Sequence, residues 1–248
     1  MKRSWILMCA VVAVVTGCGG IDEQAVTDEQ QMSPVNLATA KNNACGCTQF
    51  APTISELTAQ HAGCDSANMT SMYGYSGPCI AAANRYCSTK GYQSGTIVEL
   101  ALPNTEVSCL ESVDFSVAVS ELTAYQAQCT GSNLRNGQNE YTRVCNMAAN
   151  RYCKAKGYAT GMLQESSYDI TTEVSCVNKP VGTGYKTAVP FSTWSAYNGG
   201  CATDYNYAAN AKTCRSAAHR YCKAVHGTTS GIIVEWGANG ANDLVCLG

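Results

Sequence analysis

Cysteine is the residue type whose number and spacing most constrain the chemistry of this 248-residue chain, because 16 cysteines are present. Chains kept reduced in the cytosol rarely carry so many thiols, unless the thiols bind metal. Twelve of them fall into three sets of four with matching spacing, which indicates disulfides and an oxidising compartment. The sets are Cys64, Cys79, Cys87 and Cys109; Cys129, Cys145, Cys153 and Cys176; and Cys201, Cys214, Cys222 and Cys246.

The segment between the second and third cysteine of each set recurs almost unchanged. Cys79-Ile-Ala-Ala-Ala-Asn-Arg-Tyr-Cys87 returns as Cys145-Asn-Met-Ala-Ala-Asn-Arg-Tyr-Cys153 and as Cys214-Arg-Ser-Ala-Ala-His-Arg-Tyr-Cys222. Self-similarity at a fixed period is the mark of a repeat architecture. We therefore expect three tandem cysteine-rich repeats, over residues 45–110, 111–178 and 179–248.

The recurring segment is expected to be a helix, and its geometry restricts the disulfides. Cysteines eight apart on a helix lie roughly 12 Å apart at 1.5 Å rise per residue. A disulfide needs Cα atoms within about 7 Å, so Cys79 cannot pair with Cys87. We favour Cys64–Cys79 and Cys87–Cys109 over the remaining pairing, because a hairpin leaving the helix would return Cys109 towards Cys87. The equivalents are Cys129–Cys145, Cys153–Cys176, Cys201–Cys214 and Cys222–Cys246.

The expected fold class is α+β, with a short helix, a second helix and a β-hairpin in each repeat. Thr53-Ile-Ser-Glu56 has the spacing of a capping box that begins a first helix. Gly91 and Gly157 follow the second helix, where a left-handed residue commonly ends one. A Thr-, Ile- and Val-containing strand from Tyr92 to Leu100 and a second strand ending at Cys109 complete the unit. A module of about 60–65 residues has a marginal core, so disulfides are needed.

A pair of charges also recurs in the repeats, an arginine on the expected helix and a glutamate on the expected strand after it. One interpretation is a site in each repeat where the two side chains grip a polar ligand such as a sugar. We favour a helix–strand ion pair internal to each repeat, since a part-buried charge is seldom left uncompensated. The residues are Arg85, Arg151 and Arg220, with Glu99, Glu165 and Glu235.

The segments between the first and second cysteines are better candidates for binding. Ser66–Pro78, Thr130–Val144 and Ala202–Thr213 are rich in Asn, Ser, Gly and Tyr and differ from one another. Such composition is typical of antibody contact loops, and loops on a rigid frame often carry recognition. The alternative is that they are polar loops that bind nothing. The candidate contact residues are Tyr73, Tyr75, Tyr141, Tyr205 and Tyr207.

Other chemistry finds little support. His61, His219 and His226 occupy no position shared by all three repeats, and we expect neither an enzyme nor a cofactor or metal site. Cys45 and Cys47 lie outside the sets and would pair with each other or with a partner chain, with metal binding as the alternative. A net charge of −2 and only 14% charged residues argue against nucleic acid as a partner.

The N-terminus indicates export. Lys2 and Arg3 precede an apolar run from Trp5 to Val15, which is too short for a permanent membrane helix. The run ends in Val15-Thr-Gly-Cys18, which resembles the lipobox of bacterial lipoproteins. The resemblance implies removal of residues 1–17 and acylation of Cys18; the alternative is an ordinary secretory signal. Low hydrophobicity without helical or strand periodicity indicates a flexible tether over the rest of residues 18–44. Gly19 after the cysteine favours the outer membrane.

The repeat itself resembles cysteine-rich modules of predicted secreted bacterial proteins that have no assigned activity. We therefore expect a lipid-anchored protein of the cell envelope for binding or adhesion. It would be lectin-like and multivalent, with a glycan or another surface protein as partner. The alternative is a structural or protective envelope protein without a small ligand, followed by an inhibitor or a hydrolase.

Overall fold

The computed structural model describes residues 47–70, 77–101, 104–135, 139–167, 170–178, 183–201, 209–236 and 241–248. The chain divides into two units, residues 1–36 and 37–248, and every described residue belongs to the second. Of the helices in the described ranges, none is long and apolar enough to cross a membrane.

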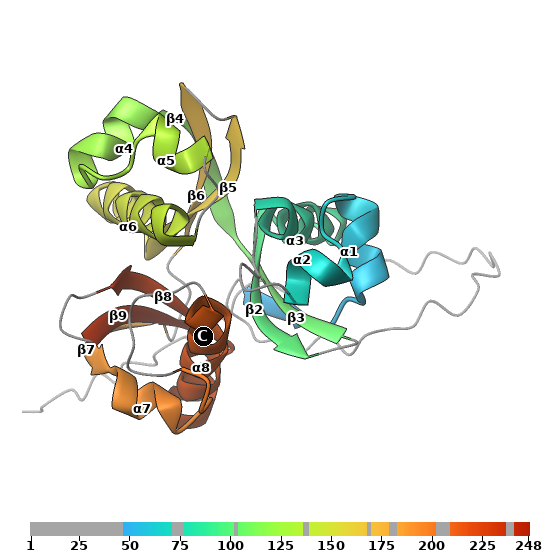
Figure 1. Cartoon of the computed structure of the whole chain (residues 1–248). Helices are drawn as coiled ribbons and strands as arrows, with labels where there is room; N and C mark the ends of the chain where they lie inside the picture. The colour runs from blue at the N-terminus through green and yellow to red at the C-terminus, as the bar shows by residue number, and fades with distance from the viewer. Residues whose placement is uncertain are drawn as a thin grey trace, which may run out of the picture. The chain divides into compact units, whose positions relative to one another are not determined.

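The second unit contains three small antiparallel sheets with helices between their strands (Figure 1). Each sheet and its helices are called a subdomain below. The first subdomain contains β1 (Cys47–Phe50), α1 (Ile54–Gln60), α2 (Ser66–Thr70), α3 (Gly77–Thr89), β2 (Ser94–Ala101) and β3 (Asn104–Leu110). The second contains β4 (Ser112–Ala118), α4 (Val119–Tyr125), α5 (Gly131–Arg135), α6 (Asn139–Ala155), β5 (Thr160–Ser167) and β6 (Thr171–Val177). The third contains β7 (Gly184–Pro190), α7 (Phe191–Ser195), α8 (Ala209–His226), β8 (Ser230–Trp236) and β9 (Ala241–Leu247).

All three sheets have the same strand order, β1-β3-β2, β4-β6-β5 and β7-β9-β8. In each, the last strand is central and pairs antiparallel with both neighbours. The α+β class is confirmed, but a hairpin alone is wrong, because the strand that precedes the helices forms a third member of the sheet. The short helices α2 and α5 are also additional to the expected elements.

The local signals in the sequence produce the helices as expected. The Thr53 hydroxyl and the Glu56 carboxylate form both halves of a capping box at the start of α1. Gly91 and Gly157 have φ values of 87° and 91°, in the left-handed region, directly after α3 and α6. This confirms that these glycines end the helices.

The six disulfides join the cysteines in the predicted pairs. Cys64 and Cys79 have Cα atoms 4.6 Å apart, and Cys87 and Cys109 have Cα atoms 5.2 Å apart. The equivalent pairs of the other subdomains are Cys129–Cys145, Cys153–Cys176, Cys201–Cys214 and Cys222–Cys246. In each subdomain one bridge joins the long helix to the segment before it, and the other joins the helix to the central strand.

The second glycine of each repeat is required by close packing rather than by a turn. A Cβ placed on Gly161 would lie 2.2 Å from Cys153 Sγ and 2.5 Å from the carbonyl oxygen of Ala149. A Cβ placed on Gly95 or Gly231 would lie at similar distances from the equivalent atoms. The long helix therefore rests directly on the first residues of the hairpin, and its fully buried alanines permit this approach.

The sheets bury their other faces in one shared cluster. Its buried members come from all three subdomains and are Cys47, Leu110, Met162, Val177, Val234, Val245 and Leu247. Two buried serine pairs, Ser108–Ser230 and Ser94–Ser112, donate hydroxyl hydrogen bonds of 2.9 Å between subdomains. The second unit thus has one core for each helix–sheet pair and a further core among the sheets.

The subdomains also meet through their long helices in a cyclic order. Helix α3 contacts β5, α6 contacts β8, and α8 contacts β2. Each long helix therefore packs on its own sheet and also against a strand of the next subdomain, and the last helix returns to the first sheet.

Candidate functional site

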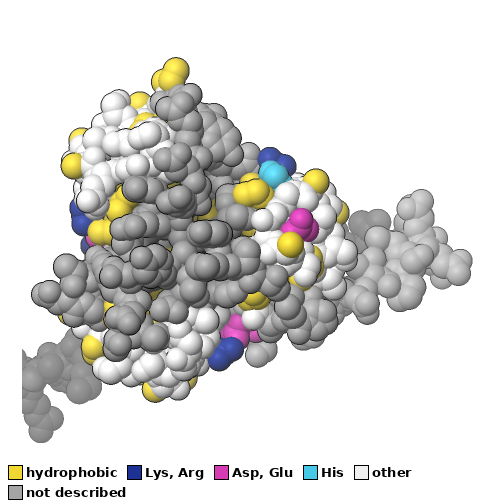
Figure 2. Space-filling view, in the orientation of Figure 1, with side chains coloured by type: hydrophobic (Ala, Val, Ile, Leu, Met, Phe, Trp, Pro, Cys, Tyr) yellow, Lys and Arg dark blue, Asp and Glu magenta, His cyan; other side chains and the backbone are white. Residues whose placement is uncertain are grey.

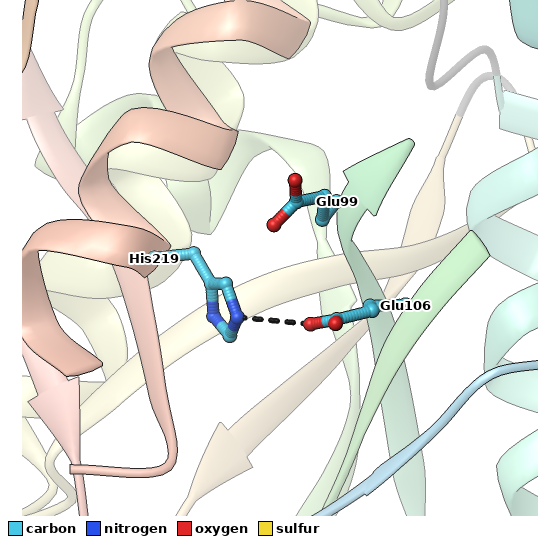
Figure 3. Close-up of side chains that lie close together, drawn as sticks. All are labelled: Glu99, Glu106 and His219. Carbon is cyan, nitrogen blue, oxygen red and sulfur yellow. Dashed lines mark hydrogen bonds and ion pairs between the residues drawn. The ribbon is translucent and has the colours of Figure 1, made fainter. Parts of the chain in front are cut away.

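Among the described residues, one group of possible metal-ligating side chains lies where α8 meets the first sheet. His219 on α8 faces Glu99 on β2 and Glu106 on β3, and the candidate ligand atoms of the three residues all lie within 4.8 Å of one another. Figure 3 shows the three side chains converging from the helix and the two strands. No single repeat contains this set, because His219 comes from the third repeat and both glutamates come from the first.

The two glutamates are direct cross-strand partners, a placement at which like charges repel. Helix α8 supplies the compensating cations. Arg220 donates two hydrogen bonds to Oε1 of Glu99, and Lys223 Nζ lies 3.8 Å from Oε2 of Glu106. The hydrogen bond to Glu99 raises the pKa of Arg220 above its usual value.

His219 is completely buried within this group. Its Nε2 lies 3.1 Å from Oε2 of Glu106 and 3.1 Å from Nε2 of the Gln49 side chain on β1. Its Nδ1 has no hydrogen-bond partner among the described residues. A buried ring nitrogen without a partner is uncommon, because it loses the hydrogen bonds that water would provide.

The junction between α6 and the third sheet repeats the plan with different residues. Arg151 donates from Nε and Nη2 to the two oxygens of Glu235, at 3.0 and 2.8 Å. The Asn150 amide occupies the position of His219 and donates to Oε1 of Glu235 at 2.9 Å, while its own oxygen accepts from Thr160. The bond to Glu235 raises the pKa of Arg151.

Tyr185 on β7 completes this second junction. Its hydroxyl donates to Oδ2 of Asp243 at 3.3 Å, and the Lys154 ammonium lies 3.9 Å from the centre of its ring. Burial, reinforced by the Asp243 charge, raises the pKa of Tyr185 to about 12. Tyr185 holds the sheet position of Gln49, since each pairs with the residue just before the closing cysteine, Val245 or Ser108.

Two of the three recurring arginines therefore form ion pairs with recurring glutamates, but the expectation that these pairs are internal to a repeat is wrong. Arg151–Glu235 and Arg220–Glu99 each join one subdomain to the next. The reason is that each long helix presents its arginine away from its own sheet, towards the neighbouring one. The remaining pair, Arg85 and Glu165, lies partly outside the described residues, because the Glu165 side chain is not among them.

The arginines have a second, local contact. Nη1 of each donates to a backbone carbonyl at or near the end of the first helix of its own subdomain, α1, α4 or α7. The carbonyls belong to Gln60, Tyr125 and Tyr197, at 3.1, 2.9 and 3.1 Å. The guanidinium of Arg151 or Arg220 thus connects a helix end in its own subdomain with a carboxylate in the next. For Arg151 or Arg220 to bind a ligand, the guanidinium would have to release both the backbone carbonyl and the carboxylate.

Several predicted site residues lie outside the described residues. They are Cys18, Cys45, Tyr73, Tyr75, Tyr205 and Tyr207, together with the side chain of Tyr141. The segments assigned as loops are partly helical, because α2 and α5 lie in the first two and the long helices begin before the second cysteine.

Cys47 is a free thiol in the cluster shared by the three sheets. A disulfide with Cys45 is therefore absent at this position, and complete burial keeps the thiol from a partner chain. Burial raises the pKa of Cys47 to about 12, opposed in part by a hydrogen bond with Ser108.

Sequence reasoning missed the acidic residue on the central strand. Glu106, Glu173 and Asp243 each stand three residues before the closing cysteine of their repeat. That spacing was available in the sequence. It would have placed a second carboxylate beside each recurring glutamate.

A polar hollow of about 410 Å³ lies where the first subdomain passes into the second. Lys90, Tyr92, Gln93, Glu111 and Asn178 are among its lining residues. Figure 2 shows the charged side chains on the described part of one face scattered rather than gathered into a patch. Protein-family models, curated proteins and solved structures were compared with this chain, and none of them matches it.

Proposed function

We propose that this protein is a lipid-anchored cell-envelope protein, adhesive or lectin-like, in which three tandem copies of one module display binding loops to a glycan or another surface protein. The observation that carries the proposal is the disulfide at the base of each variable segment. Cys64–Cys79, Cys129–Cys145 and Cys201–Cys214 bring the ends of these segments to Cα distances of 4.6, 4.7 and 4.7 Å.

A closed base supports recognition because it restricts the unbound loop and so reduces the entropy lost on binding. The frame around the loops is nearly constant between the repeats, whereas the loops differ in sequence and length. The bridges enclose sequence separations of 15, 16 and 13 residues. Constant frames with variable, tyrosine- and asparagine-containing loops are typical of binding modules.

The identical strand orders and the six equivalent disulfides support the interpretation of the three subdomains as copies of one module. Three linked sites would gain avidity on a repeating ligand, because the second and third contacts form at high effective concentration. A glycan coat or a regular protein array is such a ligand.

The anchor is proposed at Cys18, with the outer membrane as its location. Mass spectrometry of the mature N-terminus should find an acylated Cys18 and no residue from 1–17. Cys18→Ser should move the protein from the membrane fraction to the soluble fraction. An unmodified N-terminus at another residue would support an ordinary secretory signal instead.

The binding proposal is tested with the second unit, residues 37–248, on glycan arrays and on whole cells. A loop variant carrying Tyr73→Ser, Tyr75→Ser, Tyr205→Ser and Tyr207→Ser should lose most of the binding. A control with Ile170→Ser and Val225→Ser, at positions 77% and 49% exposed, should bind as the wild type does. Absence of wild-type binding on both supports would contradict the proposal.

A structural or protective role is the second candidate. It is favoured by the ion pairs Arg151–Glu235 and Arg220–Glu99 and by the shared core, which together join the three subdomains. Under this alternative, the loop variant should leave the sensitivity of the cell envelope to detergents unchanged, whereas deletion of the protein should increase it.

A further inference from the structure

We propose that Glu99, Glu106 and His219 form a binding site for a divalent first-row metal ion such as zinc, which joins the third subdomain to the first. Two carboxylates and one imidazole are ligands that zinc accepts in proteins. They come from β2, β3 and α8, and their candidate ligand atoms all lie within 4.8 Å of one another (Figure 3). A bound ion would therefore connect residues more than 100 positions apart in the sequence.

The hydrogen bonding of His219 points to a cation in this place. Lys223 donates to Oε1 of Gln49, and Nε2 of the same amide faces Nε2 of His219. The amide is a donor, so the ring nitrogen is set to accept. The same ring nitrogen also faces Oε2 of Glu106, which as a carboxylate only accepts.

One imidazole nitrogen has either one lone pair or one N–H, so it cannot satisfy Gln49 and Glu106 together. A metal ion accepts electron pairs from both Nε2 and the carboxylate, and it removes the conflict at the expense of the Gln49 contact. The observed separation suits such an ion. Two ligand atoms about 2.0–2.2 Å from zinc, with an angle of about 90–110° between them, lie about 2.8–3.6 Å from each other. Nε2 of His219 lies 3.1 Å from Oε2 of Glu106.

The second junction shows what the same place looks like without this conflict. Asn150 replaces the histidine, donates to Glu235 and accepts from Thr160, so both ends of its amide are satisfied. Glu235 and Asp243 are cross-strand partners there, as Glu99 and Glu106 are in the first sheet. The junctions differ at His219 and Asn150, and also where Gln49 is replaced by Tyr185 and Glu106 by Asp243.

Neighbouring charges set the strength that we expect. Arg220 contacts Glu99, and Lys223 lies near Glu106, so a bound ion is close to two other cations. Their repulsion weakens binding, and we expect micromolar affinity rather than that of a closed four-cysteine site. The remaining coordination positions of the ion would be taken by water.

The test uses the full-length protein, purified in detergent without a polyhistidine tag and cleared of metal with a chelator. Zinc sulfate is titrated in by isothermal calorimetry, and cobalt(II) chloride is used for visible spectra. The wild type should bind one zinc equivalent, and its cobalt spectrum should lack the thiolate charge-transfer band that binding by Cys45 or Cys47 would produce.

His219→Asn reproduces the side chain found at Asn150 and should reduce zinc affinity at least tenfold. Glu106→Gln should do the same, and His226→Asn is the control that should retain wild-type affinity. Zinc should raise the melting temperature of the wild type by several degrees and leave that of His219→Asn unchanged. Each variant is first shown to unfold cooperatively in the absence of metal, so that a loss of zinc binding cannot be caused by a loss of folding.

The proposal is overturned if metal-free wild type binds no zinc in this titration, or if His219→Asn binds it with wild-type affinity. It does not depend on the loops, so a body that binds zinc but no glycan would reject only the proposed function.

Discussion

Arg220, on the last helix of the chain, donates two hydrogen bonds to Glu99, on a strand of the first sheet 121 residues earlier. Arg151 and Glu235 make the corresponding contact between the second and third subdomains. An arginine–glutamate pair therefore joins the second subdomain to the third, which follows it in sequence, and a pair of the same kind joins the third subdomain to the first. The stability of the described body depends on these junctions as well as on the disulfides within each subdomain.

The energy of the Arg220–Glu99 contact can be measured by a double-mutant cycle with Arg220→Gln and Glu99→Gln. The arginine side chain is 46% exposed and the glutamate 13%, so solvent screens the pair and we expect a coupling of about 1 kcal/mol. Urea unfolding of the four proteins gives this value. Strictly additive single and double variants would show that the contact contributes nothing.

Gly161→Ala tests the close approach of helix and strand. The new Cβ would meet Cys153 Sγ and the Ala149 carbonyl oxygen inside van der Waals contact, so the helix or the disulfide must shift. Overpacking of this kind destabilises by about 1–3 kcal/mol or more, measured as the change in the free energy of unfolding. Gly199→Ala is the matched control, because a Cβ there meets nothing within 4 Å. Equal stability of the two variants would contradict this account of Gly161.

Much of the fold within a subdomain was predictable because its signals are local. The eight-residue spacing of Cys79 and Cys87 on a helix excluded one disulfide, and the capping box at Thr53 located a helix start. The third strand was missed, since β1 is only four residues long and is separated from its partner β3 by three helices and β2. Pairing between strands so far apart in sequence depends on the tertiary fold, and a four-residue strand is too short to give a clear sequence pattern.

The site was harder to predict than the fold. His219 looked unpromising because it has no equivalent in the other repeats, yet it lies beside two glutamates of the first repeat. Comparison of the repeats in the sequence identifies the residues that all three share, and it does not show contacts between one repeat and another. His219 meets the two glutamates because α8 of the third subdomain packs against the first sheet. This contact is seen only in the three-dimensional structure.

Tyr185 predicts a loss of stability at alkaline pH. Its folded pKa is about 12, against 10 in the unfolded chain, so between these values the unfolded state loses a proton that the folded state keeps. Ionisation then favours unfolding, and the stabilisation present below pH 10 is lost as the pH rises towards 12. Since the residue is half-buried and screened, we expect about 1 kcal/mol.

Tyr185→Phe should flatten this part of the profile, measured by urea unfolding at pH 8, 10 and 11. Tyr158→Phe, which removes a partly buried phenol hydroxyl in the second subdomain, is the control and should keep the wild-type slope. The same slope in Tyr185→Phe and in the wild type would assign the alkaline loss to other groups.

We expect the buried thiol of Cys47 to be protected from alkylation in the folded protein. Burial raises its pKa to about 12, so at pH 8 only about one molecule in ten thousand carries the reactive thiolate. Iodoacetamide should leave the Cys47 peptide unmodified in the native protein and alkylate it after unfolding in guanidinium chloride, as read by mass spectrometry. Modification at equal rates in both states would contradict the buried position.

Cys47→Ser should be tolerated, with a change in unfolding free energy within about 1 kcal/mol, because the hydrogen bond with Ser108 can be kept. The equivalent register position at the start of β4 is already a buried serine, Ser112. Cys47→Leu is the informative contrast, since a larger side chain must displace neighbours in the cluster shared by the sheets. If Leu were accepted as readily as Ser, the packing among the three sheets at Cys47 would be looser than the structure shows.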